Sequence, residues 1–295
     1  PRIYGRCDLQ NDTVEIWVEP TPTVTVTPAQ DTICTGASVN LTLTSSTAPI
    51  FPVKLRYTTI TPAGITVDPV FEVDLDNGSV LTNTITNNTD NAQLVLFIIT
   101  PYTTLSLNGE ERCAGIKDTA FIWIEPTVTI AATADTICNG GTTDIPVTSD
   151  NTTTNGIRYT WTVTDNPNVT GETDSDATGQ NIGTSIQQTL NNDTDVAQKV
   201  TYTITPWPIN EHNTNNCPGT AINVDVWIEP TVTIAATADT ICNGGTTDIP
   251  VTSGNTTTNG IRYTWTVTDN PDVTGESDSD ATGQNIGTSI QQTLT

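Results

Sequence analysis

Side chains able to do acid–base chemistry are few in this chain of 295 residues, which has 9 Lys and Arg, 33 Asp and Glu and 1 histidine. That histidine, His212, lies in the polar segment from Glu211 to Asn216 and has no counterpart in the other sequence repeats. The sequence holds no histidine-based triad, no multi-histidine metal motif and no Gly-rich phosphate loop. We therefore expect His212 to be a solvated loop residue, and we predict no catalytic residue and no cofactor.

Clustered carboxylates are the groups best suited to bind a metal ion, and the ion they suit is Ca²⁺. Asp74 and Asp76 lie in an Asp-Leu-Asp-Asn-Gly segment that resembles the first half of a calcium loop, and Asp174 and Asp176 form a second acidic group. Calcium takes six to eight oxygen ligands, and the first segment lacks the terminal bidentate Glu. Since Asp-Asn-Gly is also a common tight-turn sequence, we predict a hairpin, a solvated acidic loop and no metal site.

Cysteines occupy two recurring positions in the repeats, one before the second predicted strand and one before the last. The six are Cys7, Cys34, Cys113, Cys138, Cys217 and Cys242. None belongs to a Cys-x-x-Cys pair, so a zinc site is not expected.

Charge and composition exclude two large classes of protein. A net charge of −24 leaves too few cations to coat a phosphate backbone, which excludes nucleic-acid binding by a basic surface. No run of apolar residues approaches the roughly 18 residues of a membrane-spanning helix. The N-terminal Pro1 and Arg2 belong neither to an initiator nor to a signal peptide, so we expect a mature or trimmed segment.

Internal repetition organises the sequence. Trp123 to Leu190 recurs at Trp227 to Leu294 with three differences, and a more diverged copy lies upstream. The period of about 105 residues matches an autonomous β-sandwich domain rather than a solenoid unit. We expect four parts and a window on a longer array: 1–20 is the C-terminal strand of a preceding repeat, 21–126 is repeat 1, 127–230 is repeat 2, and 231–295 is an incomplete repeat 3.

Short runs of alternating or β-branched residues separated by turn residues predict strands and an all-β fold. In repeat 2 they are Thr127–Ala132, Thr143–Thr148, Ile157–Thr164, Ser185–Leu190, Val200–Thr205 and Ala221–Ile228. Along the third run, Tyr159 and Trp161 share one face, which indicates a strand half buried in a sandwich. Thr59 stands where Trp161 would be in repeat 1, so we expect that core to be filled differently. The fold class is therefore tandem immunoglobulin-like β-sandwich domains in an extended array.

Several motifs together resemble a known family. They include Thr136-Ile137-Cys138-Asn139-Gly140-Gly141, Val200-Thr201-Tyr202-Thr203-Ile204-Thr205-Pro206, Cys217-Pro218-Gly219-Thr220 and the Glu-Pro-Thr joint. The chain is similar to the PKD-like, immunoglobulin-like repeats of large secreted and surface proteins of Bacteroidota. The resemblance covers essentially the whole chain, more loosely in 21–126. It implies an extracellular or cell-surface protein that acts as an adhesin, a stalk or a fibre.

An extracellular setting makes disulfides the default state of these cysteines. One scheme pairs Cys34 with Cys113 and Cys138 with Cys217 inside single domains. In an immunoglobulin-like topology, however, the two loops concerned lie at opposite ends of a strand more than about 20 Å long, and bridged Cα atoms lie within about 7 Å. An inter-domain pair, Cys34 with Cys217, is therefore preferred, the intra-domain scheme remains the alternative, and the other cysteines are expected to pair partly outside the window.

Asp-Thr-aliphatic triplets recur along the chain, and they look like the O-glycosylation motif of Bacteroidota. The resemblance implies that one or more of five threonines is modified: Thr13, Thr32, Thr119, Thr136 and Thr240.

The joints between repeats share the sequence Trp-x-Glu-Pro-Thr. The tryptophans are Trp17, Trp123 and Trp227, and the prolines are Pro20, Pro126 and Pro230. Because a short linker containing proline permits little swinging, we expect each tryptophan to be substantially buried at the joint.

Two functions remain open. The favoured one is a non-catalytic structural segment of a long extracellular fibre, stalk or surface adhesin, whose partners are neighbouring repeats. The alternative is a multivalent array that binds carbohydrate, such as cell-surface glycans, or another surface through the loops of each repeat.

Overall fold

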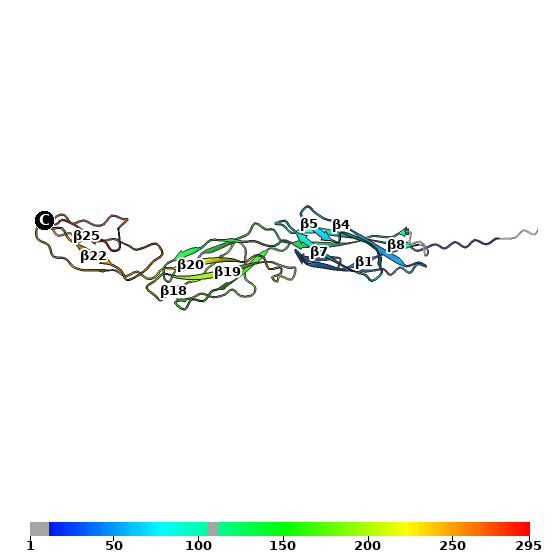
Figure 1. Ribbon diagram of the computed structural model, residues 1–295, viewed down its shortest axis with the longest axis horizontal. Helices are drawn as coiled ribbons and strands as arrows, with labels where there is room; N and C mark the ends of the chain where they lie inside the picture. The colour runs from blue at the N-terminus through cyan, green and yellow to red at the C-terminus, as the bar shows by residue number, and fades with distance from the viewer. Residues whose placement is uncertain (1–11, 105–110) are drawn as a thin grey trace, which may run out of the picture. The chain divides into compact units, whose positions relative to one another are not determined.

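The computed structural model describes residues 12–104 and 111–295, with side chains described from Cys113 onward in the second range. The chain forms two compact units, Pro1–Glu125 and Pro126–Thr295. All regular elements among the described residues are β-strands (Figure 1). The all-β prediction is therefore confirmed, while the division into four parts stays a prediction.

Unit 1 is a β-sandwich of two sheets. One sheet has the order β1-β3-β7-β5, and the other has the order β2-β10-β8-β4-β6 with β9 added to β8. The strands are β1 (Thr25–Thr27), β2 (Gln30–Cys34), β3 (Ser38–Thr44), β4 (Val53–Ile60), β5 (Ile65–Asp68), β6 (Phe71–Asp76), β7 (Val80–Asn87), β8 (Gln93–Thr104), β9 (Glu111–Ala114) and β10 (Asp118–Glu125). All pairs are antiparallel except β2 with β10, which run parallel.

Alternating side chains from both sheets fill the core of unit 1. Leu41 and Leu81 come from the smaller sheet, and Phe97 and Ile122 come from the larger one; each is at most 2% exposed. Burying a side chain of this size contributes roughly 1.5–3 kcal/mol, so the period-two pattern alone orients every strand.

Repeat 2, which lies in unit 2, has the same two-sheet architecture as unit 1. Its larger sheet has the order β12-β20-β19-β14-β16 and its smaller one has the order β11-β13-β17, with β15 paired to β18. The strands are β11 (Ala131–Ala132), β12 (Asp135–Ile137), β13 (Ile145–Thr148), β14 (Ile157–Val163), β15 (Val169–Thr170), β16 (Gln180–Asn181), β17 (Ser185–Ile186), β18 (Asn191–Asn192), β19 (Gln198–Pro208) and β20 (Ile222–Ile228). Sequence reasoning missed β12, a short segment that pairs parallel to β20.

Residues 231–295 form shorter strands: β21 (Ala235–Ala236), β22 (Ile249–Thr252), β23 (Arg262–Tyr263), β24 (Gln284–Asn285) and β25 (Ser289–Ile290). β21, β22 and β25 form one sheet, and β23 pairs with β24. Tyr263 is buried as Tyr159 is, but Trp265 is only half buried, whereas Trp161 is 8% exposed. The strands that cover Trp161 in repeat 2 have no counterpart in these 65 residues.

The register of β4 explains how repeat 1 does without Trp161. Tyr57 lies opposite Ile99 in β8, just as Trp161 lies opposite Ile204 in β19. Tyr57 is 1% exposed and its ring centroid is 5.8 Å from that of Phe97. Tyr57 therefore takes the core position of the tryptophan. The alignment of Thr59 with Trp161 is wrong, because Thr59 lies opposite Phe97 and so takes the position of Val163, which lies opposite Tyr202.

Candidate functional site

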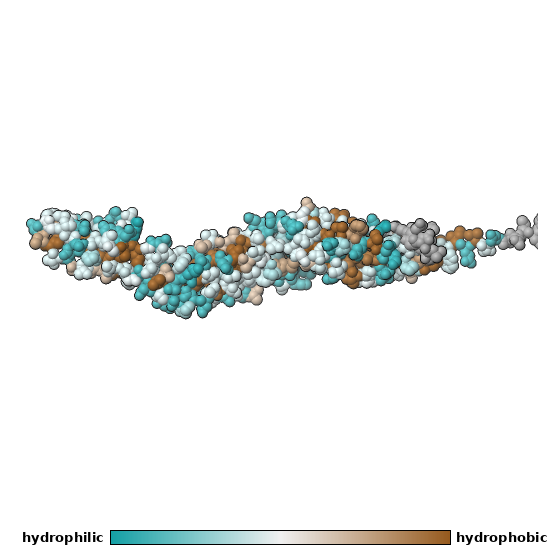
Figure 2. Space-filling view, in the orientation of Figure 1, coloured by the Kyte–Doolittle hydropathy of each residue, from teal (hydrophilic) through white to brown (hydrophobic). Residues whose placement is uncertain are grey.

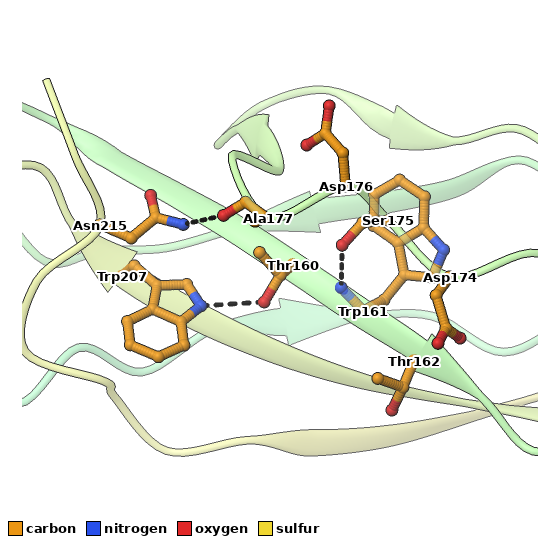
Figure 3. A pocket seen from close by; sticks show the side chains of 9 residues that line it. All are labelled: Thr160, Trp161, Thr162, Asp174, Ser175, Asp176, Ala177, Trp207 and Asn215. Carbon is orange, nitrogen blue, oxygen red and sulfur yellow. Dashed lines mark hydrogen bonds between the residues drawn. The ribbon is translucent and has the colours of Figure 1, made fainter.

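A shallow groove of about 440 Å³ opens on the larger sheet of repeat 2 (Figure 3). β14 and the end of β19 form its floor, and the segments before β16 and before β20 form its walls. It is lined by Thr160, Trp161, Thr162, Asp174, Ser175, Asp176, Ala177, Trp207 and Asn215. The groove brings the rings of Trp161 and Trp207 together with polar side chains.

Hydrogen bonds hold the groove walls in place. The indole Nε1 of Trp207 donates to Thr160 Oγ1 at 2.9 Å, which fixes the ring over β14 (Figure 3). Ser175 Oγ accepts the backbone N–H of Trp161 at 3.0 Å, and Asn215 Nδ2 donates to the carbonyl of Ala177 at 2.9 Å. A half-exposed, fixed indole face beside carboxylates is suited to stacking on a sugar ring or a cation.

The acidic residues predicted as weak calcium candidates are tied to the protein itself. Asp174 Oδ1 accepts the N–H of Val163 at 2.8 Å, and Asp176 Oδ1 accepts the N–H of Gly179 at 2.7 Å. Asp174 therefore has one oxygen bonded to the backbone of β14, and Asp176 has one bonded to the backbone of its own loop. The two line the same groove, as their spacing in the sequence suggested.

Asp74 and Asp76 in unit 1 have similar structural partners. Tyr102 Oη donates to Asp74 Oδ1 at 2.5 Å, and Lys54 Nζ is 2.7 Å from Asp76 Oδ1. Burial, followed by the hydrogen bond to Asp74, raises the pKa of Tyr102 to about 12. Within residues 12–104 and 111–295, no three His, Cys, Asp or Glu side chains converge as a metal site would require.

His212 lies in a loop, as the sequence predicted, and its side chain is 78% exposed. Its Nε2 atom is 3.5 Å from the carboxylate of Glu211. Both side chains of this pair are largely exposed, so their contact is a solvated surface ion pair when the imidazole is protonated.

A second candidate site is the joint between repeats 2 and 3, formed by residues Asp195–Ala197, Glu229 and Asn255–Thr258. Glu229 accepts the backbone N–H of Thr258 at 3.1 Å to Oε1 and 3.2 Å to Oε2, and Thr258 Oγ1 also donates to it. Backbone bonds add a short parallel bridge: Ala197 N–H donates to Thr256 O at 2.7 Å, and Thr256 N–H donates to Asp195 O at 2.9 Å. Side-chain and backbone hydrogen bonds therefore connect the two repeats at this joint.

The same glutamate makes the same kind of bond at the start of unit 1. Glu19 occupies the position of Glu229, and its carboxylate accepts the N–H of Ile50 at 3.0 and 3.2 Å. Ile50 corresponds to Thr258 because each lies three residues after a side chain, Thr47 or Asn255, that accepts the backbone N–H of the residue four positions after the joint glutamate. The Glu-Pro-Thr sequence is thus a recurring anchor for the segment that precedes the third strand of the next repeat.

A buried asparagine that sequence reasoning missed supports this joint. Asn192 is 2% exposed, and its Nδ2 donates to the carbonyls of Val196 (2.8 Å) and Ile228 (3.0 Å). Its Oδ1 accepts from the N–H and the hydroxyl of Thr194. Asn87 makes the equivalent bonds in unit 1. The signal in the sequence is the recurrence of Asn-x-Thr before the last long strands.

The prediction that all three joint tryptophans are substantially buried is wrong. Trp17 is 73% exposed, Trp123 is 39% exposed and Trp227 is 38% exposed. In β10 and β20 the neighbouring apolar residues, such as Ile122 and Ile228, are completely buried, and alternation then turns the indole to the outer face of the sheet. Of the joint prolines, Pro126 and Pro230 are buried and Pro20 is exposed.

The cysteines divide into two states, with Cys7 outside the described residues. Cys34 and Cys217 are disulfide-bonded, whereas Cys113, Cys138 and Cys242 are free thiols. In unit 1, the strand register places Cys34 of β2 opposite Glu125 at the end of β10, whereas Cys113 lies in β9, before β10 begins. About seven residues at ~3.3 Å each separate these ends, which is too far for a bond between Cys34 and Cys113.

The candidate glycosylation sites share a local geometry. In four of the triplets the aspartate Oδ1 accepts the N–H of the following threonine at 2.7–2.8 Å; these threonines are Thr32, Thr119, Thr136 and Thr240. Thr13, Thr136 and Thr240 are exposed, and the other two are half buried. Modification of any of them stays a prediction.

The fold defines a class: β-sandwich domains of the immunoglobulin-like type. Within it, the family model described as the PKD-like domain matches residues 135–232, about a third of the chain. No curated protein matches the sequence. In the part of the chain that the structure describes, no helix is long and apolar enough to cross a membrane.

Three solved structures illustrate the similarity of fold. The D00-D0 domain of intimin is 12% identical with a TM-score of 0.31, covering 70% of this chain and 99% of that one. The class 5 fimbriae chaperone CfaA is 12% identical with a TM-score of 0.28, covering 68% and 99%. A protein of unknown function from Porphyromonas gingivalis W83 is 12% identical with a TM-score of 0.23, covering 70% and 98%. Because these TM-scores lie below 0.5, no functional argument is drawn from them.

Proposed function

We propose that the chain is a non-catalytic structural segment of an extracellular fibre, stalk or surface adhesin. The observation that carries this proposal is the joint, in which Glu229 binds the N–H and the hydroxyl of Thr258. A joint made of directional bonds and a buried proline resists bending, which a spacer needs and a flexible linker would not provide. The PKD-like match of residues 135–232 and the disulfide-bonded Cys34 and Cys217 support a secreted protein.

The free thiols supply the test. Cys138 and Cys242 occupy the same position in consecutive repeats and both are exposed, so spin labels on them measure the step from one repeat to the next. With Cys7→Ser and Cys113→Ser, which leave Cys138 and Cys242 as the labelled thiols, electron–electron distance measurements should give a narrow distribution near 40 Å, one sandwich length with its joint. Glu229→Ala with Thr258→Val should broaden it. A broad distribution in the parent chain would contradict a rigid spacer.

The groove of repeat 2 favours the second candidate, a carbohydrate- or surface-binding array. Trp207 presents a fixed indole beside Asp174 and Asp176, the combination of an apolar face and oriented acceptors that sugars require. A glycan array probed with the chain and with Trp207→Ala would decide between the two. Binding that Trp207→Ala abolishes would favour the binder, and absence of binding would leave the structural role.

A further inference from the structure

An apolar surface covers the outer face of the larger sheet in unit 1. Because Val95, Phe97 and Ile99 point into the core, their neighbours in β8 must point outward. The register then lines up apolar residues across strands: Leu96 lies opposite Phe121 of β10 and Ile60 of β4. We name this surface the outer apolar face; it consists of Ile60, Phe71, Leu94, Leu96, Ile98, Phe121 and Trp123.

Much of this face is open to solvent. Phe71 is 61% exposed, Ile60 is 55% exposed and Phe121 is 46% exposed. Figure 2 shows apolar side chains gathered at the surface of unit 1 in the region of β4 and β8. A contiguous patch of this kind, unlike scattered apolar residues, marks an interaction site.

Repeat 2 shows that the fold does not require apolar residues at these positions. Its larger sheet has the same strand order, and its register places Lys199 where repeat 1 has Leu94, because each lies opposite the joint tryptophan. By the same register, Thr201 and Thr203 occupy the positions of Leu96 and Ile98. Asp225 occupies the position of Phe121. The outer apolar face is therefore a property of repeat 1 beyond what the sandwich needs.

The distribution of charge around the outer apolar face indicates which partner it can bind. The chain carries a net charge of −24, so two copies repel over most of their surfaces. The outward positions of β8 and β10 from Leu94 to Ile98 and from Thr119 to Trp123 hold no carboxylate. The cations Lys54 and Arg56 lie on β4 at one end of the face. A two-fold, face-to-face packing in which the strands of the two copies run antiparallel keeps these cations at opposite ends, so like charges do not meet.

The available area matches a reversible interface. With roughly 150–250 Å² for each large side chain, the exposed fractions give about 500 Å² of apolar surface per copy. Two copies would then bury about 1,000 Å², which lies at the lower limit of a specific interface and predicts an affinity in the micromolar range. Two sheet faces pack about 10 Å apart in this way inside β-sandwiches.

We propose that the outer apolar face of unit 1 binds a second copy of this chain, packed face to face, so that copies associate side by side. This inference is independent of the spacer proposal, since a rigid joint neither requires nor excludes lateral association.

Sedimentation velocity over a concentration series tests the inference, with Cys7, Cys113, Cys138 and Cys242 changed to Ser to exclude thiol cross-links. The parent chain should approach twice the monomer mass at about 100 μM. The matched variant carries repeat 2 residues at the same positions: Leu94→Lys, Leu96→Thr, Ile98→Thr and Phe121→Asp. Because the sandwich of repeat 2 folds with these residues, the variant should fold and its dissociation constant should rise at least about tenfold.

A reciprocal variant guards against misfolding of the first. Lys199→Leu, Thr201→Leu and Asp225→Phe transfer the apolar pattern to repeat 2 and should increase association above that of the parent. A parent chain that stays monomeric over the whole series overturns the proposal, whatever else the face binds. Equal association of the parent and a folded repeat 2-like variant overturns it as well.

Discussion

The carboxylate of Glu229 accepts both the backbone N–H and the side-chain hydroxyl of Thr258, and so anchors the loop between β22 and β23 to the end of β20. The backbone part of this bond recurs between Glu19 and the N–H of Ile50, because the glutamate is repeated and any residue but proline supplies the N–H.

Removing the anchor should release one specific amide. In Glu229→Ala the N–H of Thr258 loses its acceptor, and we expect its hydrogen exchange to accelerate about tenfold, corresponding to roughly 1.4 kcal/mol. NMR detection of the Thr258 amide measures the effect. The control is Glu211→Ala, a change at an exposed loop carboxylate, which should leave that amide unchanged. An equally protected Thr258 in Glu229→Ala would show that the bond does not hold the joint.

Asn192 should matter more for stability than its position in a loop suggests. Asn192→Ala leaves the carbonyls of Val196 and Ile228 and the N–H of Thr194 without their partner, and each unsatisfied buried group costs about 1–3 kcal/mol. We expect the free energy of unfolding of repeat 2 to fall by at least about 2 kcal/mol in urea titrations followed by tryptophan fluorescence. Asn155→Ala, at an exposed asparagine, should change it by less than about 0.5 kcal/mol.

The disulfide pairing is open to direct chemical mapping. Cys34 and Cys217 are the bonded cysteines, and the strand register separates Cys34 from Cys113 by the length of β10. We predict that a non-reducing digest of the chain contains one peptide pair that joins Cys34 to Cys217, and that alkylation before reduction labels Cys138 and Cys242. Recovery of a Cys34–Cys113 peptide would restore the intra-domain scheme.

Stability should fall at alkaline pH, in part because of Tyr102. Its pKa is about 12 in the folded chain, mainly through burial, and about 10 in an unfolded chain. The folded state therefore binds the phenolic proton more tightly, so this contribution is complete below pH 10 and is lost as the pH rises toward 12. Burial also raises the pKa of Tyr202. Tyr102→Phe should give a shallower fall of the unfolding free energy over this range; an unchanged slope would contradict the assignment.

Calcium should have no effect on the melting temperature. One oxygen of Asp174 and one of Asp176 already accept backbone N–H groups, so few of the six to eight oxygens that Ca²⁺ needs remain in the groove. Scanning calorimetry with millimolar Ca²⁺ and with a chelator should give the same Tm. A rise in Tm with Ca²⁺ that Asp174→Asn removes would instead identify the groove as a metal site.

The fold could be predicted from the sequence because the alternation of apolar and polar side chains along a strand is a local property. Ile157, Tyr159 and Trp161 recur at every second position, and all three are buried in β14 as that spacing requires. The exposure of Trp123 could have been predicted by the same rule, since the buried Ile122 and Ile124 flank it. The expectation of burial rested on the proline-containing linker, whereas the parity of the strand sets the side of the sheet on which the indole lies.

The sequence by itself determined the all-β class, the repeat period, the absence of catalytic motifs and the positions of the joints, because each is carried by composition or by neighbouring residues. Only the tertiary structure decided that Tyr57 stands where Trp161 would be, that Asn192 closes its loop, and that Leu96, Phe121 and Ile60 form one surface. These facts depend on strand register. A shift of register leaves the local pattern almost unchanged while altering every partner across the sheet, so no segment encodes its register alone.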